Sequence, residues 1–220
     1  MWQNLLSLFL QSNCLLCKRS AEVLCPYCQR QLQDCQLRYR SQSWRGDLPV
    51  FVWGYYDGVL KRAIATLKYD GQRQLGDLLG FWLGETWLKS PYSSSLKKII
   101  VVPIPLHPDK LKTRGFNQAE LIARGFCRVT GYSLQDSGLV RVKNTQPMFG
   151  LNPQERQENI QSAFALGKQF QSHFPQTPVL LIDDIYTTGV TAKEAATVLR
   201  QQGIKVLGVG AIASSRGQEA

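Results

Sequence analysis

Two adjacent acidic residues, Asp183 and Asp184, follow an apolar, β-branched run that begins at Val179. A turn with hydroxyl groups and one glycine comes next, and the pattern predicts a helix from Thr191. The apolar run is typical of a buried parallel strand, and free N–H groups at a helix start favour a bound phosphate. Gly189 lacks the Cβ that would keep a ligand from the backbone. The carboxylates can hydrogen-bond sugar hydroxyls or hold a divalent cation through water, so the segment predicts a sugar-phosphate site.

Acidic and hydroxyl residues are also common at ordinary helix starts, so a plain strand–turn–helix is the alternative interpretation. The full stretch nevertheless resembles the loop with which type I phosphoribosyltransferases bind 5-phosphoribosyl 1-diphosphate (PRPP). That loop is an apolar strand, two acidic residues, two variable residues and Thr-Thr-Gly-x-Thr. By this resemblance Asp183 and Asp184 are the catalytic residues and hold the ribose hydroxyls, directly or beside Mg²⁺. The residues expected to bind PRPP here are Tyr186, Thr187, Thr188, Gly189, Val190 and Thr191.

The composition favours anionic partners. The 220 residues suffice for one core with an appended module. The chain has 26 basic and 16 acidic residues, a net charge of +10 and a pI near 9.5. Such a charge favours nucleic acid or phosphorylated ligands without choosing between them, and a merely soluble basic protein is the alternative.

Six cysteines include two closely spaced pairs in a C-x2-C-x7-C-x2-C pattern. The pattern consists of Cys14, Cys17, Cys25 and Cys28. Two such pairs can enclose a tetrahedral zinc ion, and a closed four-thiolate shell leaves no position for catalysis. Because so small a segment has almost no core, the metal would supply its folding energy. We predict a structural Zn²⁺, with a redox pair or a chance cluster of buried cysteines as alternatives. Cys35 is a spare thiol or an alternative ligand, and Cys127 lies outside the pattern.

The apolar run at residues 5–10 is too short to span a bilayer, and it lacks the basic region and cleavage site of a signal peptide. We expect a short helix there that packs on the body of the protein. With no longer apolar segment, we expect a cytoplasmic protein without a membrane span. Thiols stay reduced in that compartment, which favours metal binding over disulfides.

Strand and helix patterns alternate along the rest of the chain. Strands are expected at residues 49–56, 98–104, 139–143, 178–185 and 204–213, and helices at 60–69, 75–88, 116–130, 152–160 and 191–202. This alternation predicts an α/β fold with a parallel sheet flanked by helices. We divide the chain into residues 1–48, an N-terminal helix and the four-cysteine zinc module, and residues 49–220, a phosphoribosyltransferase-like domain.

A basic segment follows the expected strand at residues 98–104. Residues 97–128 contain seven basic and two acidic side chains, which is +5. Prolines at the strand end stiffen a loop where ligands bind in open α/β sheets. A solvated surface loop is the alternative, and His107 is interpreted as a structural hydrogen-bonding residue rather than a base. The residues predicted to bind the pyrophosphate of PRPP are Lys68, Lys110, Lys112 and Arg114.

Several segments together resemble the ComF family of competence-associated, phosphoribosyltransferase-like proteins. The cysteine pairs match, as do residues 56–58 with 67–71. His107-Pro108 and the Arg-Gly-Phe-Asn-Gln-Ala run at 114–119 match a second block, and Arg156, Asn159, Ala163 and Phe164 match a third. Met148 departs from the family, which often has Gln three residues after the Thr of its Arg-x-x-x-Thr stretch. Ser214 and Ser215 stand where the family often has Arg and Thr.

The resemblance implies a type I phosphoribosyltransferase-like fold and a role in natural transformation. The implied partners are PRPP, single-stranded DNA and proteins of DNA uptake or recombination. Three functions remain open: a PRPP-binding protein of DNA uptake that transfers phosphoribose, a non-catalytic single-stranded-DNA adaptor on the same fold, and a nucleotide-salvage phosphoribosyltransferase. The zinc module argues against the third, because a salvage enzyme does not need it.

Overall fold

The computed structural model describes residues 13–37, 44–94, 96, 98–145, 150 and 152–215. Its strands are β1 (Val50–Tyr55), β2 (Ile100–Pro103), β3 (Ser133–Leu134), β4 (Leu139–Arg141), β5 (Phe164–Leu166), β6 (Val179–Tyr186) and β7 (Val206–Ser214). Its helices are α2 (Pro26–Gln33), α3 (Gly58–Tyr69), α4 (Gln74–Leu88), α5 (Pro108–Arg114), α6 (Gln118–Thr130), α7 (Pro153–Ile160), α8 (Lys168–Ser172) and α9 (Val190–Gln201).

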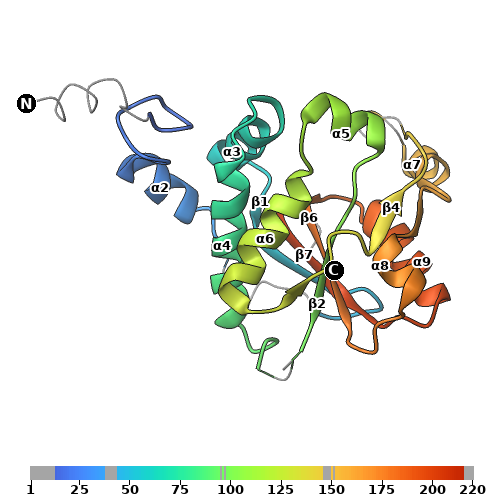
Figure 1. The fold of residues 1–220 in the computed structure, drawn as a ribbon. Helices are drawn as coiled ribbons and strands as arrows, with labels where there is room; N and C mark the ends of the chain where they lie inside the picture. The colour runs from blue at the N-terminus through green and yellow to red at the C-terminus, as the bar shows by residue number, and fades with distance from the viewer. Residues whose placement is uncertain are drawn as a thin grey trace, which may run out of the picture.

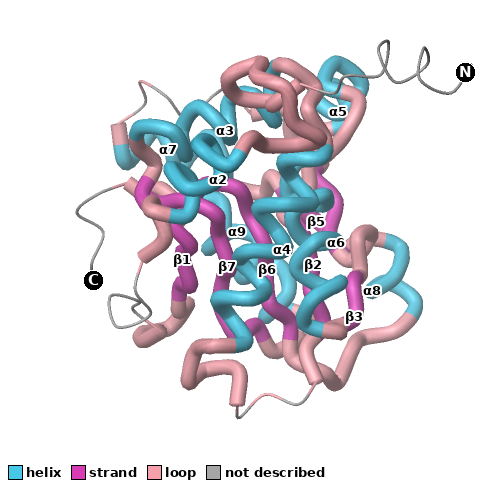
Figure 2. Tube along the Cα trace, turned by 90° about the vertical axis from the view of Figure 1, so that its left-hand side faces the viewer, coloured by secondary structure: helices cyan, strands magenta, loops and turns pink. Residues whose placement is uncertain are grey.

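Five strands form one sheet in the order β1-β7-β6-β2-β3, and every pair in it is parallel. Figure 2 shows these strands side by side. Because the strands are parallel, their carboxyl ends share one edge, and the segments that follow β1, β2 and β6 meet there. Figure 1 shows α3 and α5, which follow β1 and β2, at the same upper edge of the molecule.

Helices cover both faces of the sheet. Along β6, Leu180 and Ile182 join the core beneath α3, α4 and α6, whereas Val179 and Leu181 join the core beneath α7, α8 and α9. Alternate side chains of one strand thus reach opposite faces, and both sets are apolar. This explains why the strand reads as a continuous apolar run. The predicted parallel sheet flanked by helices is confirmed.

Helices α4 and α6 contact each other through glycines. A Cβ added at Gly80 would collide with the backbone carbonyl of Ile122, and one at Gly125 with that of Asp77. At Gly84 the nearest atom would lie 3.1 Å away. The glycines therefore allow the two helices that cover one face of the sheet to approach closely.

The segment predicted as a strand at 139–143 does not join the main sheet. β4 pairs antiparallel with β5 in a separate two-stranded sheet. Each of these strands has only three residues, too few for alternation along the chain to reveal their partner.

The stiff loop predicted after β2 contains a helix, α5. Pro108 occupies its first turn, the His107 side chain accepts a hydrogen bond from the Asp109 N–H (3.3 Å), and Gly115 ends it in the left-handed region with φ 77°. The interpretation of His107 as a structural hydrogen-bonding residue agrees with this geometry.

The segment after α2 lies along β1, where Gln36 pairs with Gly54 and the Leu37 N–H donates to the Trp53 carbonyl (2.8 Å). From α2, Leu32 is fully buried in the core beneath α3 and α4. None of the helices in the described part of the chain is long and apolar enough to cross a membrane. The helix expected at 5–10 and the departure at Met148 lie outside the described residues.

Candidate functional site

The predicted strand–turn–helix is present. β6 carries Asp183 and Asp184 and ends at Tyr186, and α9 begins at Val190, one residue before the predicted start. Gly189 precedes the helix with φ 74°, a left-handed conformation that favours glycine. A Cβ there would come within 2.2 Å of the Tyr186 hydroxyl, so a larger residue at this position would displace the Tyr186 side chain.

One hydroxyl in this turn is an unpaired donor. Thr188 Oγ1 is buried and has no hydrogen-bond partner among the described residues, whereas Thr187 is exposed. A buried hydroxyl without a partner costs about 1–3 kcal/mol. Such a cost is typical of a group that a ligand completes.

Asp184 is the most constrained acid of the site. It is 4% exposed, forms an ion pair with Lys68 of α3, and accepts a hydrogen bond from Gln118 Nε2 of α6 (3.1 Å). Burial opposes ionisation of Asp184, but the charge of the Lys68 ammonium and the hydrogen bonds to Asp184 outweigh it, so the pKa of Asp184 lies below its ordinary value. Burial likewise disfavours the charged form of Lys68, and its attraction to Asp184 nevertheless raises the pKa of Lys68. The two residues form a buried ion pair.

Asp183 differs from its neighbour. Its Oδ1 accepts a hydrogen bond from the Asp184 N–H (2.8 Å). Burial, followed by repulsion from Asp184, raises the pKa of Asp183 well above its ordinary value. The surroundings therefore favour the charged form of Asp184 and disfavour the charged form of Asp183. A cation or a hydroxyl-bearing ligand beside Asp183 would stabilise its charged form.

The run at 114–119 places one of its side chains, Gln118, in contact with Asp184. Gly115 turns the chain, and the Phe116 ring is covered by the Arg73 guanidinium, 5.1 Å from its centroid. Asn117 caps α6 by accepting from the Ala119 N–H (3.1 Å) and donates to the Ile104 carbonyl (3.0 Å). These contacts fix the loop between β2 and α6, so that Gln118 reaches Asp184.

The four predicted cations lie in different surroundings. Lys68 is bound to Asp184, Lys110 Nζ donates to the Thr145 carbonyl (2.9 Å), and half-buried Arg114 donates to Gln118 Oε1. Lys112 is exposed, and no recorded contact ties it to the other three within the described residues. The roles of all four toward pyrophosphate stay predictions.

Two residues near the acids had no role predicted from the sequence. Gln118 lies inside the matched run, but its partner is 66 positions away in the chain. Arg141 of β4 is half-buried, and burial lowers the pKa of Arg141, while attraction to Asp183 offsets part of that lowering. In the sequence, Arg141 stands out only as the first residue of the Arg-x-x-x-Thr stretch. That pattern does not predict that Arg141 lies near Asp183.

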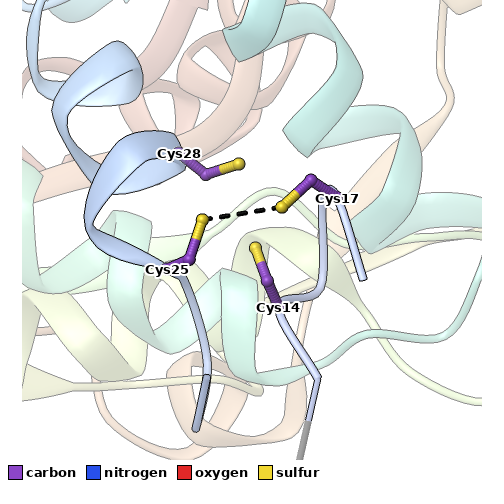
Figure 3. A group of neighbouring side chains, drawn as sticks. All are labelled: Cys14, Cys17, Cys25 and Cys28. Carbon is purple, nitrogen blue, oxygen red and sulfur yellow. Dashed lines mark hydrogen bonds between the residues drawn. The ribbon is translucent and has the colours of Figure 1, made fainter. Parts of the chain in front are cut away.

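The four paired cysteines converge, as predicted. The Sγ atoms of Cys14, Cys17, Cys25 and Cys28 all lie within 4.8 Å of one another. Figure 3 shows the four sulfurs turned toward a common centre, two from the loop before α2 and two from its start. Sulfurs around a tetrahedral zinc ion lie about 3.8 Å apart for bonds of about 2.3 Å, and Cys17 and Cys25 are separated by 3.5 Å. The cluster therefore fits a metal ion such as zinc.

The local backbone explains the convergence. Cys25 is the N-cap of α2, and Pro26 opens the helix. Burial raises the pKa of Cys28 to about 12, whereas hydrogen bonds from the Cys25 and Cys17 backbone outweigh burial and lower that of Cys14 to about 6. Cys35 lies outside the cluster, and its Sγ contacts the Gln31 carbonyl (3.4 Å).

The fold and these two sites define an α/β protein with a parallel sheet, two adjacent acids at the end of one strand, and a four-cysteine cluster before the first strand. No protein-family model matches the chain. Competence protein F of Haemophilus influenzae is 29% identical over 231 residues, 93% of this chain and 98% of that protein. Competence protein ComFC of Streptococcus pneumoniae is also 29% identical, over 86% of this chain and 79% of that protein. DNA utilization protein YhgH of Salmonella typhimurium is 25% identical, over 86% of this chain and 85% of that protein.

These relatives support the ComF family for this chain. The match extends over most of each protein rather than over one motif. Among solved structures, the glutamine PRPP amidotransferase of Bacillus subtilis gives a TM-score of 0.38 at 16% identity, over 64% of this chain and 26% of that one. The chain thus spans about a quarter of that enzyme, and so distant a likeness carries no argument here.

Proposed function

We propose that the chain binds PRPP at the carboxyl end of β6 and acts in DNA uptake and use. The observation that carries the proposal is the combination of an unpaired buried hydroxyl at Thr188, a left-handed Gly189 and two acids of opposite pKa shift, which all lie between Asp183 and Gly189. A sugar phosphate complements these groups. Its phosphate would accept hydrogen bonds from the Thr188 hydroxyl and the start of α9, and its ribose hydroxyls would bind the acids.

Each part of the turn has a distinct task in this proposal. The 5-phosphate of PRPP accepts hydrogen bonds from Thr188 and from backbone N–H groups at the start of α9. Asp183 and Asp184 hold the ribose hydroxyls. Asp184 needs Lys68 and Gln118 to keep its position, because an unpaired carboxylate that is 4% exposed would be costly.

The same residues suit transfer of phosphoribose. When pyrophosphate leaves, positive charge develops at the anomeric carbon, and carboxylates close to it stabilise that charge. Carboxylate oxygens are the donors that Mg²⁺ prefers, so Asp183 and Asp184 are the residues that would hold it, and it would neutralise charge on the leaving group. Positive side chains from α5 complete the surroundings of the pyrophosphate.

A structural Zn²⁺ in the cysteine cluster belongs to the proposal. Four thiolates close the coordination shell, so the ion holds the loop and α2 together rather than meeting a substrate. The relatives are named for competence and for DNA utilization. Together with a net charge of +10, those names support single-stranded DNA as the partner, along with proteins of DNA uptake.

A calorimetric titration with ribose 5-phosphate, PRPP and pyrophosphate, with and without Mg²⁺, tests the proposal. We expect saturable one-site binding of PRPP and of ribose 5-phosphate, weakened by Thr188→Val. Thr197→Val is the matched control, because Thr197 lies on the exposed side of α9 and its hydroxyl is bonded to the Lys193 carbonyl (2.9 Å). Wild-type protein that bound neither ligand would contradict the proposal. A non-catalytic adaptor would then be favoured, provided that the protein binds single-stranded DNA with steep salt dependence.

A further inference from the structure

Tyr69, the last residue of α3, carries a large aromatic side chain on the surface of the protein. It is 77% exposed, the highest value among the large hydrophobic side chains of the described residues. A single exposed ring is ordinary on a protein surface. Tyr69 differs because the Arg114 guanidinium of α5 lies over its ring, 5.8 Å from the centroid. An aromatic ring and a cation from two different helices therefore meet at the surface.

A second pair of the same kind lies beside the first. The Arg73 guanidinium lies over the ring of Phe116, 5.1 Å from its centroid, and donates to the Gly115 carbonyl (3.0 Å). Arg73 follows Tyr69 by four residues, and Phe116 follows Arg114 by two. Both pairs therefore join the turn between α3 and α4 to the end of α5. We call this surface the Tyr69 platform, which consists of Tyr69, Arg73, Arg114 and Phe116.

The Tyr69 platform has a positive charge. Residues 69–73 and 108–116, which contain it, carry four basic and two acidic side chains, a net charge of +2. Among the described residues neither Arg73 nor Arg114 pairs with a carboxylate, whereas Arg124 and Arg128 each do. A guanidinium edge binds phosphate oxygens, and an exposed ring stacks on a flat ring. The two together suit a ligand that has both groups.

Contacts on two sides connect the Tyr69 platform to the acids of β6. Lys68, the residue before Tyr69, forms an ion pair with Asp184. Arg114 donates to Gln118, which in turn donates to Asp184 (3.1 Å). The platform therefore lies at the same edge of the sheet as the proposed PRPP site, while the Tyr69 side chain extends into solvent.

We propose that the Tyr69 platform stacks one unpaired base of single-stranded DNA, with Arg73 and Arg114 binding the adjacent backbone phosphates. This inference names the contact surface for the DNA partner and rests on that part of the proposed function. Every base has a π face, so stacking on Tyr69 tolerates any sequence. In a duplex the bases are enclosed in the stack and are out of reach. The ring of Tyr69 therefore selects single strands over duplexes.

Fluorescence anisotropy of labelled oligonucleotides with the full-length, zinc-loaded protein tests the platform. The probes are a short oligothymidylate, an abasic oligomer with the same number of phosphates, and a duplex of the same length, all at one fixed salt concentration. Tyr69→Ala removes the ring, and Tyr69→Phe keeps it. Tyr27→Ala is the matched control, because Tyr27 of α2 is 57% exposed and has the Arg19 guanidinium 5.6 Å from its ring centroid.

Tyr69→Ala should weaken the binding of oligothymidylate about fivefold to a hundredfold, the range for one lost base stack. Tyr69→Phe and Tyr27→Ala should bind it like wild type. The abasic oligomer and the duplex should bind to all four proteins alike, because neither offers an unpaired base. PRPP binding and the unfolding temperature should be unchanged in Tyr69→Ala, since the side chain is exposed and lies outside the PRPP site.

The platform would be refuted if Tyr69→Ala bound oligothymidylate like wild type, or if it lost the abasic oligomer to the same extent. An equal loss in Tyr27→Ala would also refute it, because the effect would not depend on this surface. If wild type bound no oligonucleotide, the platform and the DNA partner would both be wrong, whereas PRPP binding would still support the PRPP site. Absence of PRPP binding, with the loss in Tyr69→Ala as expected, would contradict the PRPP site alone.

Discussion

Replacing Asp183 and Asp184 separately by asparagine should change the stability of the ligand-free protein in opposite directions. The two residues are adjacent, and each substitution replaces one carboxylate oxygen by an amide nitrogen. Asp184 is paired with Lys68, whereas Asp183 is held in surroundings that disfavour its charge. The pair of variants therefore separates a structural carboxylate from one whose ionisation opposes folding.

The magnitudes follow from burial. Breaking a buried ion pair by removing one partner costs about 3–5 kcal/mol. The Lys68 side chain keeps 17% of its exposure, and an amide oxygen can still accept from Gln118, so we expect about 2–3 kcal/mol for Asp184→Asn. Asp183→Asn removes a charge that burial disfavours, so it should stabilise the folded protein by about 0.5–2 kcal/mol. In a chain of this size one kcal/mol moves Tm by about 2–4 °C. Asp184→Asn should thus lower Tm by about 4–12 °C, and Asp183→Asn should raise it by about 1–8 °C.

The pH dependence gives a second test with a defined sign. The depressed pKa of Asp184 contributes stability above the unfolded-state value of about 3.9, and that contribution is lost as pH falls through the folded-state pKa. The raised pKa of Asp183 imposes a cost that grows as pH rises from about 3.9 to its folded-state pKa. The gain from Asp183→Asn should therefore vanish below about pH 4. Thermal unfolding from acidic to neutral pH, without ligand, measures both effects. A loss of similar size in the two variants at neutral pH would refute the assignment of charge to Asp184.

Three further predictions concern other parts of the molecule. Gly80→Ala should destabilise the protein by about 1–3 kcal/mol in denaturant unfolding, because its Cβ collides with the Ile122 backbone; Gly84→Ala should cost clearly less, and equal costs would contradict the close approach of α4 and α6. Thr188→Val should raise the free energy of unfolding by about 1 kcal/mol, because it removes a buried hydroxyl without a partner. The same substitution should weaken the binding of ribose 5-phosphate. A loss of stability would mean that the hydroxyl is bonded in the free protein. Cys28→Ser should reduce bound zinc in metal analysis from one equivalent to well below it, and acidification should release zinc because protons compete for thiolates; full retention in the variant would exclude a four-sulfur site.

The long apolar segments carried most of the information about the fold. Residues 179–182 of β6 and 206–213 of β7 carry no charged or polar side chain because helices cover both faces of the sheet, and they could be recognised from composition alone. The cysteine cluster was equally accessible, because all four ligands lie within 15 residues. The three-residue strands β4 and β5 were not assigned to their own sheet, since a strand of that length leaves no periodic pattern.

The relations across the site were not predictable from one sequence. The Arg-Gly-Phe-Asn-Gln-Ala run was found as a matched pattern, but only the fold explains it: a turn at Gly115, a cap at Asn117 and a hydrogen bond from Gln118 to an acid of β6. Arg141 lies on an element whose partner was not foreseen, so nothing along the chain linked it to Asp183. Chemistry that depends on groups from different strand ends requires the topology first.

The central claim is that the turn after β6 binds PRPP, and the most direct measurement is calorimetric titration of the zinc-loaded protein with PRPP, with and without Mg²⁺. The account predicts saturable binding at one site, strengthened by Mg²⁺ and weakened by Thr188→Val but not by Thr197→Val. Absence of PRPP binding in the folded wild-type protein under both conditions would contradict it. Equal binding by the two threonine variants would also contradict it, because the site would then lie elsewhere.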